Sequence, residues 1–372
     1  MSSTLTQDQR DLVEAVGDFC SRELAGTPQR PHDDGFYRKL AALGWLGIAT
    51  AESEGGAGRG MRDLVLFLET TAYHRAPMGG FATSVITAAT YEKFGSDEQR
   101  RRVLTDFLDG EVLSISMSEP GAGSDVGALT CRAEQREGGG WVVNGQKTWC
   151  SNAHIAKHIL LVARTSGEGG KHEGLTMFSV PADAEGLTVR GIDTMGGKEV
   201  NDLFFTDCEL GEDAVVGTEG KAWPQLMTGL NTERMILAAV MLGTARRAFD
   251  DTVAYVRQRE QFGRPVGSFQ ALRHRLADHA TELECTRLLV HDVAERIDAA
   301  PDTLFAREAS MAKLKATEFA KAMALDGMQM LGGYGYATEY GMESLLRSTV
   351  VSTVYGGTSE IQRDIIGKSY GL

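Results

Sequence analysis

The stretch Ser-Met-Ser-Glu-Pro-Gly-Ala-Gly-Ser-Asp occupies residues 116–125, and Val-Tyr-Gly-Gly-Thr-Ser-Glu-Ile-Gln-Arg occupies residues 354–363. In the first stretch, Gly121 and Gly123 carry no Cβ and let the backbone approach a bound ring closely, while Ser118 provides a short hydroxyl donor. Glycine-serine loops are common, so this loop gains its meaning from the motifs that accompany it. By itself it predicts a ligand-binding turn.

Length and charge restrict the class of protein. The chain has 372 residues, which is too long for one compact core and favours two or three domains. It carries 51 acidic and 38 basic residues, a net charge of −13, so neither nucleic acid nor an anionic membrane is expected as a partner. The five cysteines and eight histidines show no metal-ligand spacing, and we therefore expect reduced thiols, no metal and a cytoplasmic location.

No targeting or membrane segment is expected. The first ten residues lack both an apolar secretory core and an Arg-rich presequence. The longest apolar stretch, 235–243, is about half of the roughly 20 residues that a membrane helix requires.

The hydrophobic pattern changes twice along the chain and predicts three domains. Residues 1–111 have helical spacing, and both Thr6–Gln9 and Ser96–Gln99 match the capping box that begins a helix. Residues 112–222 contain short apolar runs between Gly-rich turns, which predict a small β domain. From 223 to 372 the helical period returns and predicts an antiparallel four-helix bundle, with long helices at 229–260, 269–299, 302–331 and 340–355.

Further motifs join the two opening stretches. They are Asn-Gly-Gln-Lys-Thr-Trp-Cys-Ser-Asn at 144–152, Arg-Gln-Arg-Glu-Gln-Phe-Gly at 257–263, Ser-Phe-Gln at 268–270 and Gln-Met-Leu-Gly-Gly-Tyr-Gly at 329–335. In this order, the set resembles the acyl-CoA dehydrogenases over essentially the full length. The resemblance implies a mostly α fold with a central β domain: an N-terminal helical domain, a β-barrel-like middle domain and a C-terminal four-helix bundle.

The resemblance also implies a role and partners. It implies an oxidoreductase of fatty acid metabolism that uses FAD, acts on an acyl-CoA and passes electrons to an electron-transfer flavoprotein. Because family members share FAD sites across subunit interfaces, it further implies a homotetramer or a homodimer.

Cofactor residues are implied in both halves of the chain. Met117 and Ser118 match positions beside the flavin pyrimidine edge, Trp149 matches one against the isoalloxazine, and Ser151 matches one within reach of N5. The other matches are Gly123, Ser124, Thr358 and Glu360 in the subunit's own site, and Arg259, Phe262, Gln270, Gln329, Gly332 and Gly333 toward the FAD of a neighbouring subunit. The substrate-side matches are Ser124, Asn231, Arg234, Tyr355, Gly356 and Gly357.

Gly356 is the main departure from the family. The residue before Gly357-Thr-Ser is most often the catalytic glutamate, whereas glycine supplies only its backbone N–H, which in the family helps to polarise the thioester carbonyl. Such a site requires a carboxylate on one substrate face and flavin N5 on the other. A minority of the family, including relatives of isovaleryl- and long-chain acyl-CoA dehydrogenases, places the base in a Glu-Arg pair on a C-terminal-domain helix, and Glu233-Arg234 resembles that pair.

Two assignments of the base stay open at this point. Glu233 is the first; apolar neighbours are expected to raise its pKa and Arg234 to oppose this. An acidic residue near a helix N-terminus is also an ordinary structural feature. Glu360, in the last predicted helix, is the second. The chain as a whole has alternatives too: a dehydrogenase of carrier-protein thioesters, a flavin monooxygenase on the same scaffold, or a silent subunit that completes a partner's FAD site.

Overall fold

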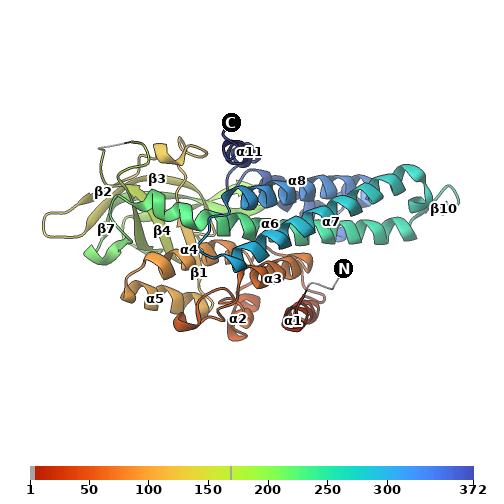
Figure 1. The fold of residues 1–372 in the computed structure, drawn as a ribbon, viewed down its shortest axis with the longest axis horizontal. Coiled ribbons are helices and arrows are strands. Elements are labelled where there is room, and N and C mark those ends of the chain that lie inside the picture. Colours follow the sequence, from red (N-terminus) through yellow and green to blue (C-terminus); the bar gives the residue numbers. More distant parts are fainter. Residues whose placement is uncertain (1–4, 168–169) are drawn as a thin grey trace. The chain divides into compact units, whose positions relative to one another are not determined.

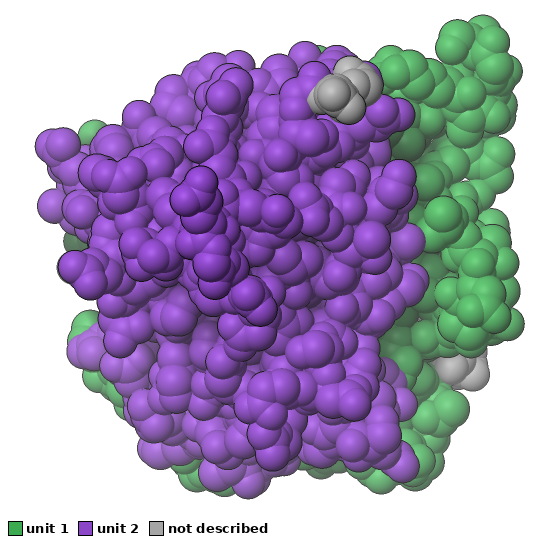
Figure 2. Space-filling model, turned by 90° about the vertical axis from the view of Figure 1, so that its left-hand side faces the viewer, with its two compact units in different colours: residues 1–29, 60–76, 231–372 green, residues 30–59, 77–230 purple. Residues whose placement is uncertain are grey.

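The computed structural model describes residues 5–167 and 170–372, which form two compact units (Figure 2). We call residues 1–29, 60–76 and 231–372 the helical unit, and residues 30–59 and 77–230 the sheet unit. The mostly α fold with a central β domain is confirmed, whereas the three-domain boundaries stay a prediction. Within the described ranges, no helix combines the length and the apolar character needed to cross a membrane.

The sheet unit is built on one sheet of eight strands (Figure 1). The order is β6-β7-β3-β2-β4-β5-β8, and β1 pairs in parallel with β4. Alternating inward side chains such as Val143, Phe178 and Leu203 form its core. The strand bounds are β1 Val112–Ser116, β2 Arg132–Gln135, β3 Trp141–Ser151, β4 Ala156–Arg164, β5 Leu175–Pro181, β6 Leu187–Thr194, β7 Gly197–Leu210 and β8 Val215–Val216.

The expectation of a β-barrel-like domain was wrong in one respect, because the sheet does not close. β6 and β8 end the strand order, and no ladder joins them among the described residues. β8 has only two residues, and β6 is largely exposed. Such short or polar edges end a sheet without inviting another strand.

Helices of the sheet unit are α2 Asp34–Ala42, α4 Phe81–Phe94 and α5 Asp97–Leu108, with 3-10 turns η1 Glu52–Glu54, η2 Val126–Ala128 and η3 Glu212–Ala214. The predicted capping box at Ser96 is confirmed: its hydroxyl accepts the Gln99 N–H, and the Gln99 side chain accepts the Ser96 N–H. The Gln99 amide also donates to the Val215 carbonyl at 3.0 Å, which ties α5 to β8.

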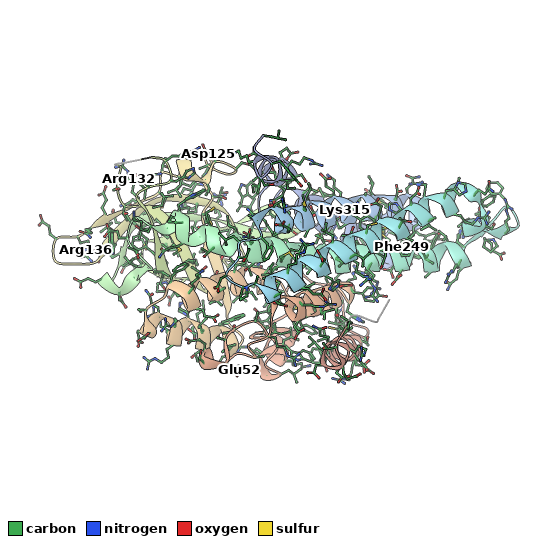
Figure 3. The ribbon with its side chains drawn as sticks, in the orientation of Figure 1. Glu52, Asp125, Arg132, Arg136, Phe249 and Lys315 are labelled. Atoms are coloured by element: carbon green, nitrogen blue, oxygen red, sulfur yellow. The ribbon has the colours of Figure 1, made fainter. Side chains whose placement is uncertain are left out.

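The helical unit is organised around α8, which contacts α7, α10 and α11. Lys315 of α8 (Figure 3) forms an ion pair with Glu282 of α7. The capping box at Thr6, which begins α1, is confirmed as well. The bounds are α1 Gln7–Glu23, α3 Met61–Tyr73, α6 Ala222–Gln258 (in this unit from residue 231), β9 Glu260–Gln261, β10 Arg264–Pro265, η4 Val266–Ser268, α7 Gln270–Ala299, α8 Ala306–Leu331, α9 Gly333–Tyr336, η5 Thr338–Tyr340, α10 Met342–Val350, η6 Val351–Thr353 and α11 Ser359–Lys368.

The predicted long helix at 340–355 was wrong. The structure has a short helix, α10, followed by the 3-10 turn η6 and a turn at Gly356. Gly341 and Gly356 both have positive φ, 72° and 60°, which a continuous right-handed helix excludes. The break matters because it brings the backbone of Gly356 to face α6.

Candidate active site

The glycine-rich loop after β1 is held by a buried ion pair. Lys147 of β3 is fully buried, and its Nζ donates to Glu119 Oε1 and to the Met117 carbonyl, each at 2.9 Å. Glu119 also accepts the N–H groups of Thr130 and Cys131. Burial opposes ionisation of Glu119, but Lys147 and these N–H groups hold its pKa below the usual value. The loop therefore has a fixed conformation of its own.

Trp149 lies beside this loop, on a bulge of β3 where the register with β7 shifts. The preceding residue, Thr148, donates its N–H to the Ser118 carbonyl at 2.9 Å. Trp149 has a φ of 59° and is 58% exposed, a rare conformation for a bulky residue and a rare exposure for an indole. Such strain is typical of functional sites. An exposed indole beside the loop that carries Ser118, with Ser151 two residues further along β3, fits a planar, heteroatom-bearing ring.

The glycines of the loop leave its backbone open. A Cβ on Gly121 or Gly123 would meet no described atom within 4 Å, and neither residue has a positive φ. The fold itself therefore does not require glycine at these positions. An exposed strip of backbone that ends in Ser124 and Asp125 (Figure 3) is the cradle that a ring ligand needs. The sheet unit thus brings together all of its predicted cofactor residues.

Glu233 lies on α6 in the helical unit, opposite Gly356. Its Oε1 is 3.6 Å from the position that a Cβ on Gly356 would take, and Leu237 Cδ1 is closer than 3.0 Å to the same position. A side chain at 356 would therefore collide with Leu237. Among the described residues, the Gly356 N–H donates to no acceptor. The position that most often carries the family's base is here a bare backbone beside a carboxylate.

The surroundings of Glu233 weaken its acidity. Met235 and Ile236, next to it on α6, are fully buried. Burial raises the pKa of Glu233, and the positive charges of Arg234 and Lys313 act in the opposite direction. Arg234 itself is turned toward Asn231, to whose Oδ1 it donates at 2.7 Å. Burial has the largest effect, so the pKa of Glu233 lies above the usual value, in the direction that the sequence predicts.

The turn that carries Gly356 is held by hydrogen bonds from two side chains, Lys313 and Gln362. Lys313 of α8 donates from Nζ to the carbonyls of Ser352, at 3.0 Å, and Gly357, at 2.8 Å. Gln362 donates to the carbonyls of Gly356 and Gly357, both at 3.0 Å. Sequence reasoning missed Lys313. The available signal was a lysine inside the run of small residues that forms the buried face of α8, Ala309, Ala312, Ala316 and Ala320.

Glu360 has a different environment. It is exposed in the first turn of α11, whose N-cap is Thr358. Hydrogen bonds, chiefly to its own backbone N–H and to Thr358, lower the pKa of Glu360. An exposed carboxylate with a lowered pKa is a weaker base than a half-buried one with a raised pKa.

The remaining predicted cofactor residues gather at helix ends. Arg259 follows α6, Gln270 begins α7, and Phe262 lies at the tip of the β9–β10 hairpin, where it is 93% exposed. The last turn of α8 and the residues after it carry Gln329, Gly332 and Gly333. At 1.5 Å per residue, α6 separates Glu233 from Arg259 by roughly 38 Å. Arg259 therefore lies far from the Glu233 of its own chain.

Sequence families match nearly the whole chain. The acyl-CoA dehydrogenase N-terminal domain matches residues 6–111, the middle domain matches 114–208 and the C-terminal domain matches 220–371. Among curated proteins, the mitochondrial isovaleryl-CoA dehydrogenase of Solanum tuberosum is 33% identical over 97% of this chain and 90% of its own length.

Solved structures share the fold. A glutaryl-CoA dehydrogenase from Mycobacterium smegmatis, in complex with FADH2, has a TM-score of 0.89 and 25% identity over 98% of this chain and 95% of its own. The prolyl acyl carrier protein oxidase AnaB has a TM-score of 0.90 and 27% identity over 99% of this chain and 100% of its own. These matches confirm the predicted fold, the enzyme class and the FAD-binding scaffold. The chain therefore belongs to the acyl-CoA dehydrogenase family of oxidoreductases acting on CH–CH groups.

Proposed function

We propose that this chain oxidises an acyl-CoA to the trans-2-enoyl-CoA, with Glu233 as the base that removes the α-proton. One observation carries the proposal: Glu233 Oε1 lies 3.6 Å from the Cβ position of Gly356, beside the backbone where the family most often carries its base. The carboxylate of Glu233 on α6 thus replaces the glutamate side chain that position 356 lacks.

Each residue around Gly356 has a separate role in the proposed reaction. Glu233 receives the α-proton, and its raised pKa makes it a better acceptor than an exposed carboxylate. The Gly356 N–H donates to the thioester carbonyl and stabilises the negative charge that develops on its oxygen. Asn231, Arg234, Tyr355 and Gly357 bind the substrate, and Ser124 is a further substrate-binding residue.

FAD fits the residues of the sheet unit. Trp149 provides a flat apolar face, Met117, Ser118 and Ser151 flank it, and the bare backbone at Gly123 admits a ring. Thr358 and Glu360 are further FAD-binding residues. When bound, FAD accepts the β-hydride at N5 as the α,β double bond forms.

Assembly completes the cofactor site. Arg259, Phe262, Gln270, Gln329, Gly332 and Gly333 reach the FAD of a neighbouring subunit, and the roughly 38 Å along α6 between Glu233 and Arg259 supports this division of roles. We propose a homotetramer, with a homodimer as the smaller alternative. The reduced enzyme passes its electrons to an electron-transfer flavoprotein.

One relative supports a second candidate substrate, an acyl group carried by an acyl carrier protein. AnaB acts on a prolyl acyl carrier protein, and its fold matches this chain end to end. An acyl group on a carrier protein presents the same thioester and α-carbon as acyl-CoA. The Glu233–Gly356 geometry serves either carrier.

The test uses purified, FAD-loaded protein under anaerobic conditions. Straight-chain, branched and prolyl thioesters are offered both as CoA and as carrier-protein conjugates, and flavin absorbance and enoyl product are followed together. Bleaching with stoichiometric enoyl product supports the proposal, and the faster carrier identifies the substrate. Rapid oxygen consumption by the reduced flavin with hydroxylated product indicates a monooxygenase. Loss of FAD from the isolated chain indicates a silent subunit.

A further inference from the structure

Lys313 is a buried cation in an unexpected place. Its side chain has no exposed surface, and the buried face of α8 around it carries the small residues Ala309, Ala312 and Ala316. In the described part of the chain, no carboxylate forms an ion pair with its Nζ, which donates instead to the carbonyls of Ser352 and Gly357. Burying an ammonium group costs several kcal/mol unless other interactions compensate. An apolar side chain of similar length would fill the same space without that cost.

The two carbonyls show what the cation holds. Ser352 lies in η6 and Gly357 follows the turn, so the two bonds clamp the backbone on both sides of Gly356. Gly356 and Gly357 have φ values of 60° and 81°, and the Gln362 side chain also donates to the carbonyls of both, so Lys313 and Gln362 hold this turn together. The Lys313 ammonium therefore restrains the backbone on either side of the Gly356 N–H.

The charge of Lys313 also acts on Glu233. Around Glu233, the charged groups are Arg234 from its own helix and Lys313 from α8. Around Lys313, they are Glu233 and Arg234 from α6, Glu318 from α8 and Glu360 from α11. Burial lowers the pKa of Lys313 to about 8, with Glu233 the main opposing influence. The two groups therefore stabilise each other's charged forms.

We propose that Lys313 is a positioning residue of this site, which clamps the Ser352–Gly357 turn so that the Gly356 N–H faces the thioester. The proposal rests on the proposed function, because it requires Glu233 to be the base. Lys313 has two effects on this site, which can be measured separately. The clamp affects the rate at every pH, whereas the charge affects the pH at which Glu233 becomes active.

The variants are Lys313→Met, which removes both effects, Lys313→Gln, which keeps an amide donor without charge, and Lys313→Arg, which keeps the charge. Lys315→Met is the matched control, since Lys315 lies on the same helix but pairs with Glu282 of α7. FAD content and thermal midpoint are measured first. If only one neutral variant folds, that variant carries the test alone.

The readout is the rate of anaerobic flavin bleaching as a function of pH, with the best thioester found for the wild type. For Lys313→Met we expect a plateau that is roughly ten- to hundredfold lower and an acid limb displaced upward by about one pH unit. Lys313→Gln should shift the limb similarly, whereas Lys313→Arg should keep it near the wild-type position. Lys315→Met should match the wild type.

Two outcomes distinguish the two hypotheses. A folded neutral variant with the wild-type plateau and acid limb overturns the role of Lys313. A Glu233→Gln enzyme that bleaches at the wild-type rate in the same assay overturns the proposed function instead. If Glu233→Gln is inactive and the neutral Lys313 variants behave as the wild type, only the Lys313 inference fails.

Discussion

Replacing Gly356 by alanine tests the geometry on which the site depends. Gly356 has a φ of 60°, and a side chain in that region costs about 1–2 kcal/mol. The added Cβ would also lie closer than 3.0 Å to Leu237 Cδ1, so Leu237 must move, and overpacking of this kind costs about 1–3 kcal/mol. Together the two effects predict a destabilisation of about 2–5 kcal/mol.

The assay is thermal unfolding of the FAD-loaded protein, in which a loss of this size lowers the midpoint by several degrees. Gly367→Ala is the control, because Gly367 lies in α11 with ordinary φ and nothing within 4 Å of its Cβ position. Leu237→Ala should cost less stability in the Gly356→Ala background than in the wild type, because there it also removes the overpacking. A Gly356→Ala midpoint equal to that of the wild type, or strictly additive effects of the two changes, would refute this reasoning.

Three further predictions follow from the same site. Glu119→Gln leaves the Lys147 ammonium buried without its counter-ion, so we expect a loss of about 3–5 kcal/mol and weaker FAD retention after gel filtration. The folded-state pKa of Glu119 is below its unfolded value, so ionised Glu119 stabilises the fold above the unfolded pKa of about 4.3. This stabilisation is lost as the pH falls through the folded-state pKa. Thermal midpoints from pH 7 to pH 3 should show this decline in the wild type and less of it in Glu119→Gln. Trp149→Gly relieves a positive φ, so it should raise the thermal midpoint of the apo-protein. The same variant should bind FAD at least tenfold more weakly in a fluorescence titration. A variant with a lower midpoint would contradict the argument that Trp149 is strained. Glu360→Gln, compared with the wild type at equal FAD loading, should keep the bleaching rate within about threefold, because an exposed carboxylate with a lowered pKa is not the base. A loss of several orders of magnitude in the FAD-loaded variant would assign that role to Glu360.

Much of the fold could be read from the sequence because its signals are local. The capping boxes at Thr6 and Ser96 specify hydrogen bonds within four residues, and both form as expected. The helical period of α7 and α8 likewise depends only on nearby residues. The long helix at 340–355 failed because glycines at its ends take left-handed conformations, which periodicity does not detect.

The candidate site was only partly readable, for a physical reason. Gly356 was noticeable because it lacks the side chain that this motif usually carries. Glu233 was noticeable because a second motif, the Glu233-Arg234 pair, provides a carboxylate that could replace it. Lys313 meets Gly357 across 44 positions of sequence, and Lys147 meets Glu119 across 28, so these contacts exist only once the chain has folded. The open sheet was missed for a similar reason, since strand alternation does not reveal whether the edge strands pair.

Proton abstraction by Glu233 is the central claim, and one comparison tests it most directly. Wild type and Glu233→Gln, each loaded with FAD, are mixed anaerobically with the best thioester substrate, and flavin bleaching and enoyl product are measured in the same samples. We expect Glu233→Gln to retain FAD and the wild-type thermal midpoint while its bleaching rate falls by about two to four orders of magnitude. Bleaching by the folded, FAD-loaded Glu233→Gln enzyme at the wild-type rate would contradict the account.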